Sequence, residues 1–281
     1  VLNISIEVLK IQRVGKWVGK GFFNLKIYFK HYSGAMTEYD YLFFDCMAIV
    51  NDEEEDKALS EGWLPDDYLI KKHYSGEILK SHWYQARQTR INLSKFEDTK
   101  SAKKTRKKCK NIIAKPILAN KVNLCELETI FKKYTEYRGF KAWELKPLII
   151  SEPKRKYFLI YYLNEKPIAF TFMRDVGSNS VFSTQFAWDY ENPKLYLGKY
   201  ANLAEIDYCI ENNKDFMYLG LGYEKSCLYK ADYKGFEFWT GQEWSNDTEH
   251  YKWLCERDST IEKTRDLDKI KRYDDKFFFN K

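Results

Sequence analysis

Apolar side chains recur at every second position early in the chain, which is the period of a half-buried β-strand. Residues 23–29 alternate between apolar and polar side chains, and residues 39–50 form a mixed aromatic and apolar run. Because the pattern is that of strands and not of helices, we expect β-structure in the first fifty residues.

An acidic segment after residue 50 predicts a short helix. Asn51 or Asp52 can cap its beginning, the acidic residues suit the positive end of the helix dipole, and Gly62 can end it. We interpret residues 63–67 as a loop.

Strand character gives way to helical character between residues 82 and 118. Residues 82–93 are typical of a strand, whereas Asp98 or Thr99 can cap a basic helix that continues to about Ile113. We expect Pro116 to stop this helix, because proline disrupts a helix interior.

The second half of the chain predicts a helix, three strands, a second helix and a last strand. Asn123 and Glu126 suit the start of the first helix, and Gly139 suits its end. The three strands, separated by short turns, should form an antiparallel meander, and Gly198 leads into the second helix. The strand ranges are 157–163, 168–175, 181–188 and 216–220. We place a boundary near residue 118, which separates an N-terminal α/β region with the basic helix (1–118) from a second domain (119–281).

Composition narrows the class of protein. The 281 residues are 44% hydrophobic and 31% charged, which suits a globular protein and excludes disordered or collagen-like chains. No stretch approaches the roughly 18 apolar residues that cross a bilayer, so we expect no membrane partner and a cytoplasmic location. The six cysteines are widely spaced without a CxxC pair, which favours free thiols.

Charge is unevenly distributed, although the net charge is only +6. Residues 100–115 contain many lysines, one arginine and no acid, whereas residues 38–61 are strongly acidic. A basic segment of this kind is either a solvated helix face or a surface that binds a polyanion, and the pattern alone leaves both open.

Several short motifs occur in a fixed order after residue 180. They are Trp188-Asp189, Leu197-Gly198, Glu205-Ile206, Tyr218-Leu219-Gly220, Cys227 and Tyr229-Lys230. In this order they resemble the C-terminal half of the arginyl-tRNA protein transferases, within the aminoacyl-tRNA-protein transferase family. Arg90-Ile91, Phe96 and the segment 99–104 resemble the first half of the family, with lysines in place of arginines. The resemblance covers roughly residues 39–238, and the N-terminal cysteine cluster of the family is absent.

This resemblance implies an α+β fold with a GNAT-like (acyl-CoA N-acyltransferase) core, in which helices flank a mixed, mostly antiparallel sheet, plus an N-terminal α/β extension. It also implies that an amino acid, arginine in the first place, passes from aminoacyl-tRNA to the N-terminal α-amine of a protein or peptide, often one that begins with Asp or Glu. Two alternatives stay open: an acyl-CoA-dependent N-acyltransferase, and a non-catalytic relative that binds tRNA or another RNA.

Candidate site residues follow from the resemblance and from the chemistry of each side chain. Asp189 is the first choice for orienting an amine, with a turn aspartate as the alternative, and Glu205 either serves similarly or faces solvent. Tyr229 could protonate the leaving ribose hydroxyl and Lys230 could bind an anion. We add Gln185 to this catalytic set.

The expected substrate-binding residues are Arg90, Gly198 and Tyr223. Trp83, Tyr84 and Tyr223 are candidates for stacking on unpaired bases. The expected tRNA-binding residues are Lys100, Ser101, Lys103, Lys104, Arg106, Lys107 and Lys108.

We expect no cofactor other than the aminoacyl-tRNA that serves as donor substrate. None of the four histidines has metal-like spacing to cysteines or acids, so we predict no metal. An activated ester requires no covalent enzyme intermediate, and we therefore expect no nucleophilic cysteine.

Overall fold

A computed structural model describes the chain over residues 8–9, 24–33, 38–50, 52–65, 82–139, 144–146, 154–189, 195–223 and 225–259. The predictions for Phe23, Asn51 and residues 66–67 lie outside these ranges. The chain divides into two compact units, each described below by itself. Unit 1 comprises Val1–Arg90, Leu221–Asp232 and Phe236–Lys281, and unit 2 comprises Ile91–Gly220 and Tyr233–Gly235.

Unit 1 contains the predicted N-terminal strands. They form a five-stranded sheet in the order β1-β2-β3-β5-β4, with antiparallel neighbours throughout. The strands are β1 (Val8–Leu9), β2 (Asn24–Ser33), β3 (Glu38–Ile49), β4 (Trp63–Pro65) and β5 (His82–Gln85). Unit 1 also holds η1 (Asp52–Glu54), α1 (Glu55–Ser60), η5 (Lys225–Asp232), β12 (Phe236–Trp239), β13 (Trp244–Ser245) and α6 (Thr248–Asp258).

Two details of unit 1 differ from the sequence interpretation. Trp63 and Leu64 are buried and lie in β4, paired with β5, where a loop was expected. The predicted strand 82–93 is interrupted at residues 86–87, so that β6 (Gln88–Asn92) follows β5 as a separate strand. The short acidic helix is confirmed as α1, and Gly62 follows it with a φ of 76° against the indole ring of Trp239, where a side chain would not fit.

Unit 2 contains the predicted meander. Strands β8 (Lys156–Leu163), β9 (Lys166–Val176) and β10 (Ser180–Trp188) are antiparallel neighbours, and the chain then passes through α5 (Leu197–Glu211) into β11 (Phe216–Leu221), which pairs with β10 in parallel. Within unit 2 the strand order is β11-β10-β9-β8-β7. The predicted fold class is confirmed: the protein is α+β, with a mostly antiparallel sheet flanked by helices.

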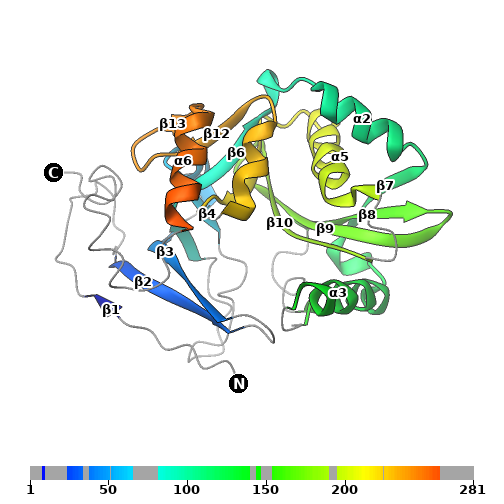
Figure 1. Ribbon diagram of the computed structural model, residues 1–281, viewed down its shortest axis with the longest axis horizontal. Helices are drawn as coiled ribbons and strands as arrows, with labels where there is room; N and C mark the ends of the chain where they lie inside the picture. Colours follow the sequence, from blue (N-terminus) through cyan, green and yellow to red (C-terminus); the bar gives the residue numbers. More distant parts are fainter. Residues whose placement is uncertain are drawn as a thin grey trace. The chain divides into compact units, whose positions relative to one another are not determined.

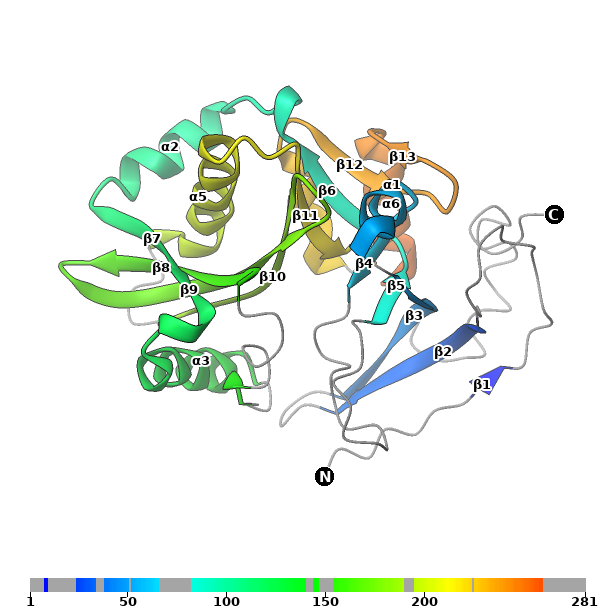
Figure 2. The same ribbon diagram turned by 180° about the vertical axis from the view of Figure 1, so that it is seen from behind.

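Helices cover both faces of this sheet. Helices α2 (Lys100–Lys108) and α5 lie side by side on one face, and α3 (Leu124–Arg138) lies on the other (Figures 1 and 2). On the α3 face, Leu127 and Phe131 pack with Phe158 and Phe170 in a buried apolar cluster. As predicted, α3 ends at Gly139, which has the left-handed conformation (φ 69°) that favours glycine.

The basic helix is shorter than predicted. Thr99 caps α2, since its hydroxyl accepts a hydrogen bond from the Ala102 backbone N–H at 3.2 Å. The helix ends at Lys108, and residues 112–118 form β7 (Ile112–Leu118), which is antiparallel to β8. Pro116 therefore does not stop a helix but lies in β7, an edge strand of the sheet. Proline is tolerated there, because the outer side of an edge strand has no neighbouring strand to which a backbone N–H must donate. The predicted domain boundary at 118 differs from the spatial division, because β7 and β8 lie on either side of it and belong to one sheet.

Candidate functional site

The parallel pair β10 and β11 provides the frame of a candidate site within unit 2. Their ladder covers only Ser180↔Phe216 to Phe182↔Tyr218, whereas the ladder between β10 and β9 continues to Trp188. Ligands of α/β sheets commonly bind beyond the carboxyl ends of strands where neighbours diverge. We name the end of β10 with the beginning of α5 the β10–α5 site.

Asp189 directly follows β10 and is nearly buried. Its backbone N–H donates to the carbonyl of Ile168 at 2.8 Å, which fixes the end of the strand. Its carboxylate accepts a hydrogen bond from the Nζ of Lys133, on α3, at 2.8 Å. The carboxylate therefore already holds an alkylammonium group, and a substrate amine that binds there has to take the place of Lys133. Lys133 was not identified from the sequence, because its partner lies 56 residues away.

Glu205 lies on the opposite face of the same sheet. It does not face solvent, which was one reading of the sequence, but is fully buried under α5. Its Oε1 accepts a hydrogen bond from the hydroxyl of Thr171 at 2.7 Å and from that of Tyr161 at 3.4 Å. Since Asp189 is bound to α3 and Glu205 to the strands beneath α5, the structure does not bring these two carboxyl groups together.

The environment of Glu205 favours its protonated form. Burial raises the pKa of the carboxyl group, and hydrogen bonds from Thr171, Ser183 and Tyr161 oppose the rise without cancelling it. The pKa of the Tyr161 phenol is also raised, first by burial and then by the charge of Glu205. This buried cluster under α5 was missed from sequence because Tyr161 and Thr171 come from strands that a local pattern does not connect to residue 205.

Gln185 and Gly198 complete the predicted residues of the site. The Gln185 Nε2 donates to the backbone carbonyl of Phe186 at 2.8 Å. Gly198 is exposed in the first turn of α5, and a Cβ at this position would lie 3.7 Å from the Phe186 ring, an ordinary contact. Packing therefore does not demand glycine at position 198, and a close approach of a ligand to the backbone stays a prediction.

Helix α2 presents cations to solvent. Ala102 and Thr105 are buried on the side that faces α5. Ser101 is exposed, and its hydroxyl accepts a hydrogen bond from the Nζ of Lys199 at 2.9 Å. We define the lysine face of α2 as the exposed residues Lys100, Lys103, Lys104, Lys107 and Lys108.

Arg106 does not belong to this face, although it was predicted to bind tRNA. Its guanidinium bonds to Asp98 at 2.8 Å and to both carboxylate oxygens of Asp207 on α5. Burial lowers its pKa, but the two aspartates more than compensate and leave the pKa raised. Arg106 thus fastens α2 to α5, because its forked guanidinium bonds to Asp98 and Asp207 together.

Arg90, Tyr223, Tyr229 and Lys230 belong to unit 1. Arg90 is buried against Glu237, with Nε and Nη2 at 2.9 and 2.7 Å from its Oε2, and lies over the Trp244 ring. The Nζ of buried Lys230 donates to the carbonyl of Leu221 at 2.5 Å. These contacts give Arg90 and Lys230 structural roles in unit 1, whereas Tyr229 is half exposed.

The predicted stacking residues are mostly enclosed. Trp83 and Tyr223 are buried, and the Tyr223 hydroxyl accepts a hydrogen bond from the backbone N–H of Arg87 at 2.7 Å. The Arg87 guanidinium lies over the Tyr223 ring. Neither Trp83 nor Tyr223 therefore offers a face to an unpaired base, and Tyr84 is half-buried.

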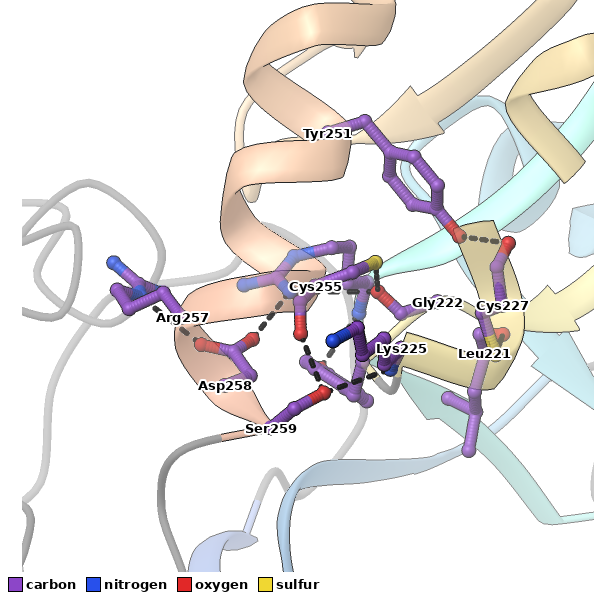
Figure 3. Close-up of polar contacts among 11 residues, drawn as sticks. Leu221, Gly222, Lys225, Cys227, Tyr251, Cys255, Arg257, Asp258 and Ser259 are labelled. Atoms are coloured by element: carbon purple, nitrogen blue, oxygen red, sulfur yellow. Dashed lines mark hydrogen bonds and ion pairs between the residues drawn. The ribbon is translucent and has the colours of Figure 1, made fainter. Parts of the chain in front are cut away.

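Cysteines of unit 1 take part in a network of polar contacts between η5 and α6 (Figure 3). The Cys255 thiol donates to the carbonyl of Gly222 at 3.3 Å, and the Tyr251 hydroxyl donates to the carbonyl of Cys227 at 3.2 Å. Burial raises the pKa of Cys255 to about 11, so this thiol stays protonated at neutral pH. All five cysteines whose side chains are described are free.

Two features are absent from the described residues. No three His, Cys, Asp or Glu side chains come together there as a metal site would require. Nor is any helix in the described ranges sufficiently long and apolar to span a bilayer.

Several solved structures are similar to parts of this chain at low sequence identity. They include the C-terminal domain of a putative lysylphosphatidylglycerol synthetase from Agrobacterium fabrum (11% identity, TM-score 0.40, 48% of this chain and 46% of that chain) and L-PGS from Bacillus licheniformis (11%, 0.41, 48% and 46%). FemX is similar over 77% of this chain and 79% of its own, at 10% identity and a TM-score of 0.41. The chain matches less than half of the first two structures. No curated protein matches the sequence significantly.

A family model gives a direct assignment. Residues 92–240, more than half of the chain, match the model described as arginine-tRNA-protein transferase, C terminus. The match includes α2, the meander, the β10–α5 site and β11, which are the elements that position Asp189, Glu205 and the lysine face of α2. The chain therefore belongs to the arginine-tRNA-protein transferase C-terminus family.

Proposed function

We propose that the protein transfers an amino acid, arginine in the first place, from aminoacyl-tRNA to the N-terminal α-amine of a protein or peptide. Family membership supports the class of reaction. The observation that carries the proposal is the exposed lysine face of α2, which Arg106 fastens to the helix that begins at the β10–α5 site. In this proposal the reaction takes place in the cytosol, where charged tRNA is available.

The reaction is the aminolysis of an ester. The lone pair of the α-amine attacks the ester carbonyl carbon, a C–N bond forms, and the C–O bond to the terminal ribose breaks. The amine loses a proton and the ribose oxygen gains one. Because an α-amine has a pKa near 8, part of it is already the free base at neutral pH, and modest assistance suffices.

Asp189 is the residue that we propose for binding the acceptor amine. Its carboxylate already accepts a hydrogen bond from an ammonium group, that of Lys133, at 2.8 Å. An acceptor ammonium that replaces Lys133 would be held in the same way and would release its proton before attack. The displaced Lys133 side chain is half exposed and can return to solvent.

The first turn of α5 is the proposed location for the developing oxyanion. Backbone N–H groups at the beginning of a helix favour negative charge, and the exposed Gly198 leaves no side chain in the way. Glu205 is buried on the opposite face of the sheet from Asp189, and burial raises its pKa. In this scheme it would hold α5 on the sheet and would not contact substrate.

The test supplies tRNA charged with labelled arginine and a peptide that begins with Asp or Glu. We expect label in the peptide, and none in a matched peptide with an acetylated N-terminus. The same assay with tRNAs charged with other amino acids identifies the donor. Tight tRNA binding without transfer of any amino acid would favour a non-catalytic RNA-binding relative. Saturable binding of coenzyme A without tRNA affinity would favour an acyl-CoA-dependent enzyme. Either result would overturn the proposal.

A further inference from the structure

Tyr196 is an exposed aromatic residue at the beginning of α5. Its side chain is 55% exposed, so its ring contributes little to the packing of unit 2. It directly precedes Leu197, the first residue of the helix, and so lies at the β10–α5 site. No local pattern distinguishes it among the 22 tyrosines of the chain.

A lysine of α2 lies against this ring, and further lysines occur on α2 and in the first turn of α5. The Nζ of Lys108 lies 4.0 Å from the centroid of the Tyr196 ring. Lys199, three residues along the chain, donates a hydrogen bond to Ser101 of α2, and Lys104 and Lys107 are exposed on the same helix. An exposed aromatic ring at the β10–α5 site is thus in contact with a residue of the lysine face.

This combination is typical of surfaces that bind single-stranded nucleic acid. Such surfaces neutralise phosphates with lysines and stack bases on exposed aromatic rings. An isolated exposed tyrosine is ordinary, but a ring with a lysine against it and further exposed lysines on the same helix suits a partner that carries both bases and phosphates. Charge complementarity therefore favours RNA as the occupant.

We propose that Tyr196 stacks an unpaired nucleotide at the 3′ end of the donor tRNA, while Lys108 and Lys199 neutralise the adjoining phosphates. This inference rests on the proposed function. The 3′ end is the part of a charged tRNA that is both single-stranded and joined to the ester, and Tyr196 lies where the lysine face of α2 meets the β10–α5 site. The ring would guide the terminal nucleotides from the lysines toward the site of transfer.

The test compares two RNAs and three variants. One RNA is an intact tRNA, and the other lacks its unpaired 3′ nucleotides. Tyr196→Ala removes the ring, Tyr196→Phe keeps it, and Tyr137→Ala removes an exposed tyrosine of α3, on the opposite face of the sheet (Figures 1 and 2). Thermal unfolding of each variant checks that the fold is retained.

We expect Tyr196→Ala to weaken binding of intact tRNA about 5- to 150-fold, the range of base stacking on an aromatic ring. Tyr196→Phe and Tyr137→Ala should bind like the wild type. With truncated RNA, Tyr196→Ala and the wild type should bind equally. The slope of log affinity against log salt should stay unchanged in Tyr196→Ala, because stacking releases no counterions, whereas Lys108→Gln should reduce the slope by about one unit.

The outcomes distinguish failure of the stacking inference from failure of the proposed function. If the wild type binds intact tRNA and Tyr196→Ala binds it equally well, the stacking inference is wrong and the proposed function stands. If Tyr196→Ala weakens both RNAs alike, the ring does not act on the 3′ end and the inference is again wrong. If the wild type binds neither RNA at low salt, the proposed function fails and the inference fails with it.

Discussion

Glu205 is a carboxyl group enclosed between α5 and the strands of unit 2. Its hydrogen bonds to Thr171 and Tyr161 give it partners, but burial still disfavours the charged form and raises its pKa. Helix α5 has buried residues on most of its turns, including Ala201, Leu203, Ile206 and Cys209. A helix of this kind has no clear polar face, which is why the sequence pattern did not decide whether Glu205 points inward.

The raised pKa of Glu205 predicts a pH-dependent stability that Glu205→Gln should remove. In the folded protein the carboxyl keeps its proton to a higher pH than in the unfolded chain. Its favourable contribution is therefore complete below the ordinary glutamate pKa and is lost as pH rises through the folded-state pKa. Relative to the wild type, the free energy of unfolding of Glu205→Gln should increase across that window and then stay constant. Urea unfolding at several pH values between 4 and 8 measures this difference. A difference that does not change with pH would contradict the assignment.

Asp189 and Lys133 form the ion pair in which we place the acceptor amine. If the carboxylate binds that amine, Asp189→Asn should raise KM for the acceptor peptide and lower kcat/KM, by roughly tenfold or more, as loss of a charge-assisted contact implies. Lys133→Gln removes the competing ammonium and should leave kcat/KM equal or higher. The measurement is transfer at varied peptide concentration with saturating charged tRNA. Equal losses in both variants would instead indicate that the pair only anchors α3 to the end of β10.

At the scale of elements, α2 combines an anchor and an exposed face. Arg106 and the buried Ala102 and Thr105 hold it to α5, whereas its lysines point to solvent. Arg106 and the lysines therefore have separable roles, and substitutions of lysine should leave the helix in place.

Replacing Lys103, Lys104, Lys107 and Lys108 by glutamine should weaken tRNA binding and flatten its salt dependence. Each lost phosphate contact reduces the slope of log affinity against log salt by about one unit, so the four together should reduce it by up to about four. The matched control replaces the exposed lysines Lys121, Lys132, Lys146 and Lys154, which lie outside α2, and should retain the wild-type slope. Filter binding from 50 to 200 mM salt measures both. Equal slopes in the two variants would contradict a binding role for α2.

Much of the element order could be predicted because strands and helices carry local patterns. The meander, the helix after it, the strand β11 and the ends of α1 and α3 at Gly62 and Gly139 all follow from periodicity and turn residues. The end of α2 could not be predicted from periodicity and turn residues. The stretch after Lys108 remains basic, and only pairing with β8, more than forty residues later, makes residues 112–118 a strand.

At the scale of the whole molecule, the sequence boundary near 118 and the two spatial units differ for a topological reason. Unit 1 gathers its first ninety residues together with segments after residue 220, whereas unit 2 is nearly continuous. A pattern along the sequence can indicate where a domain boundary lies, but it does not reveal that the last elements belong to the same unit as the first. For this reason Arg90 and Lys230, which were expected at the site, prove to be held by contacts inside unit 1, with Glu237 and Leu221.

The lysine face and Asp189 offer different groups, cations for phosphates and a carboxylate for an amine, which predicts that binding and chemistry can be tested apart. A short donor, arginine esterified to adenosine, carries the reactive ester but lacks the phosphates that the lysines of α2 would neutralise. We expect the wild type to transfer arginine from it slowly, and the four-lysine variant of α2 to do so at the same rate, although the two differ strongly with charged tRNA. Asp189→Asn should be impaired with both donors, because the acceptor amine is common to them. Single-turnover transfer with each donor measures these rates. Loss of transfer from the short donor in the lysine variant would mean that α2 shapes the site itself, and the division of roles would be wrong.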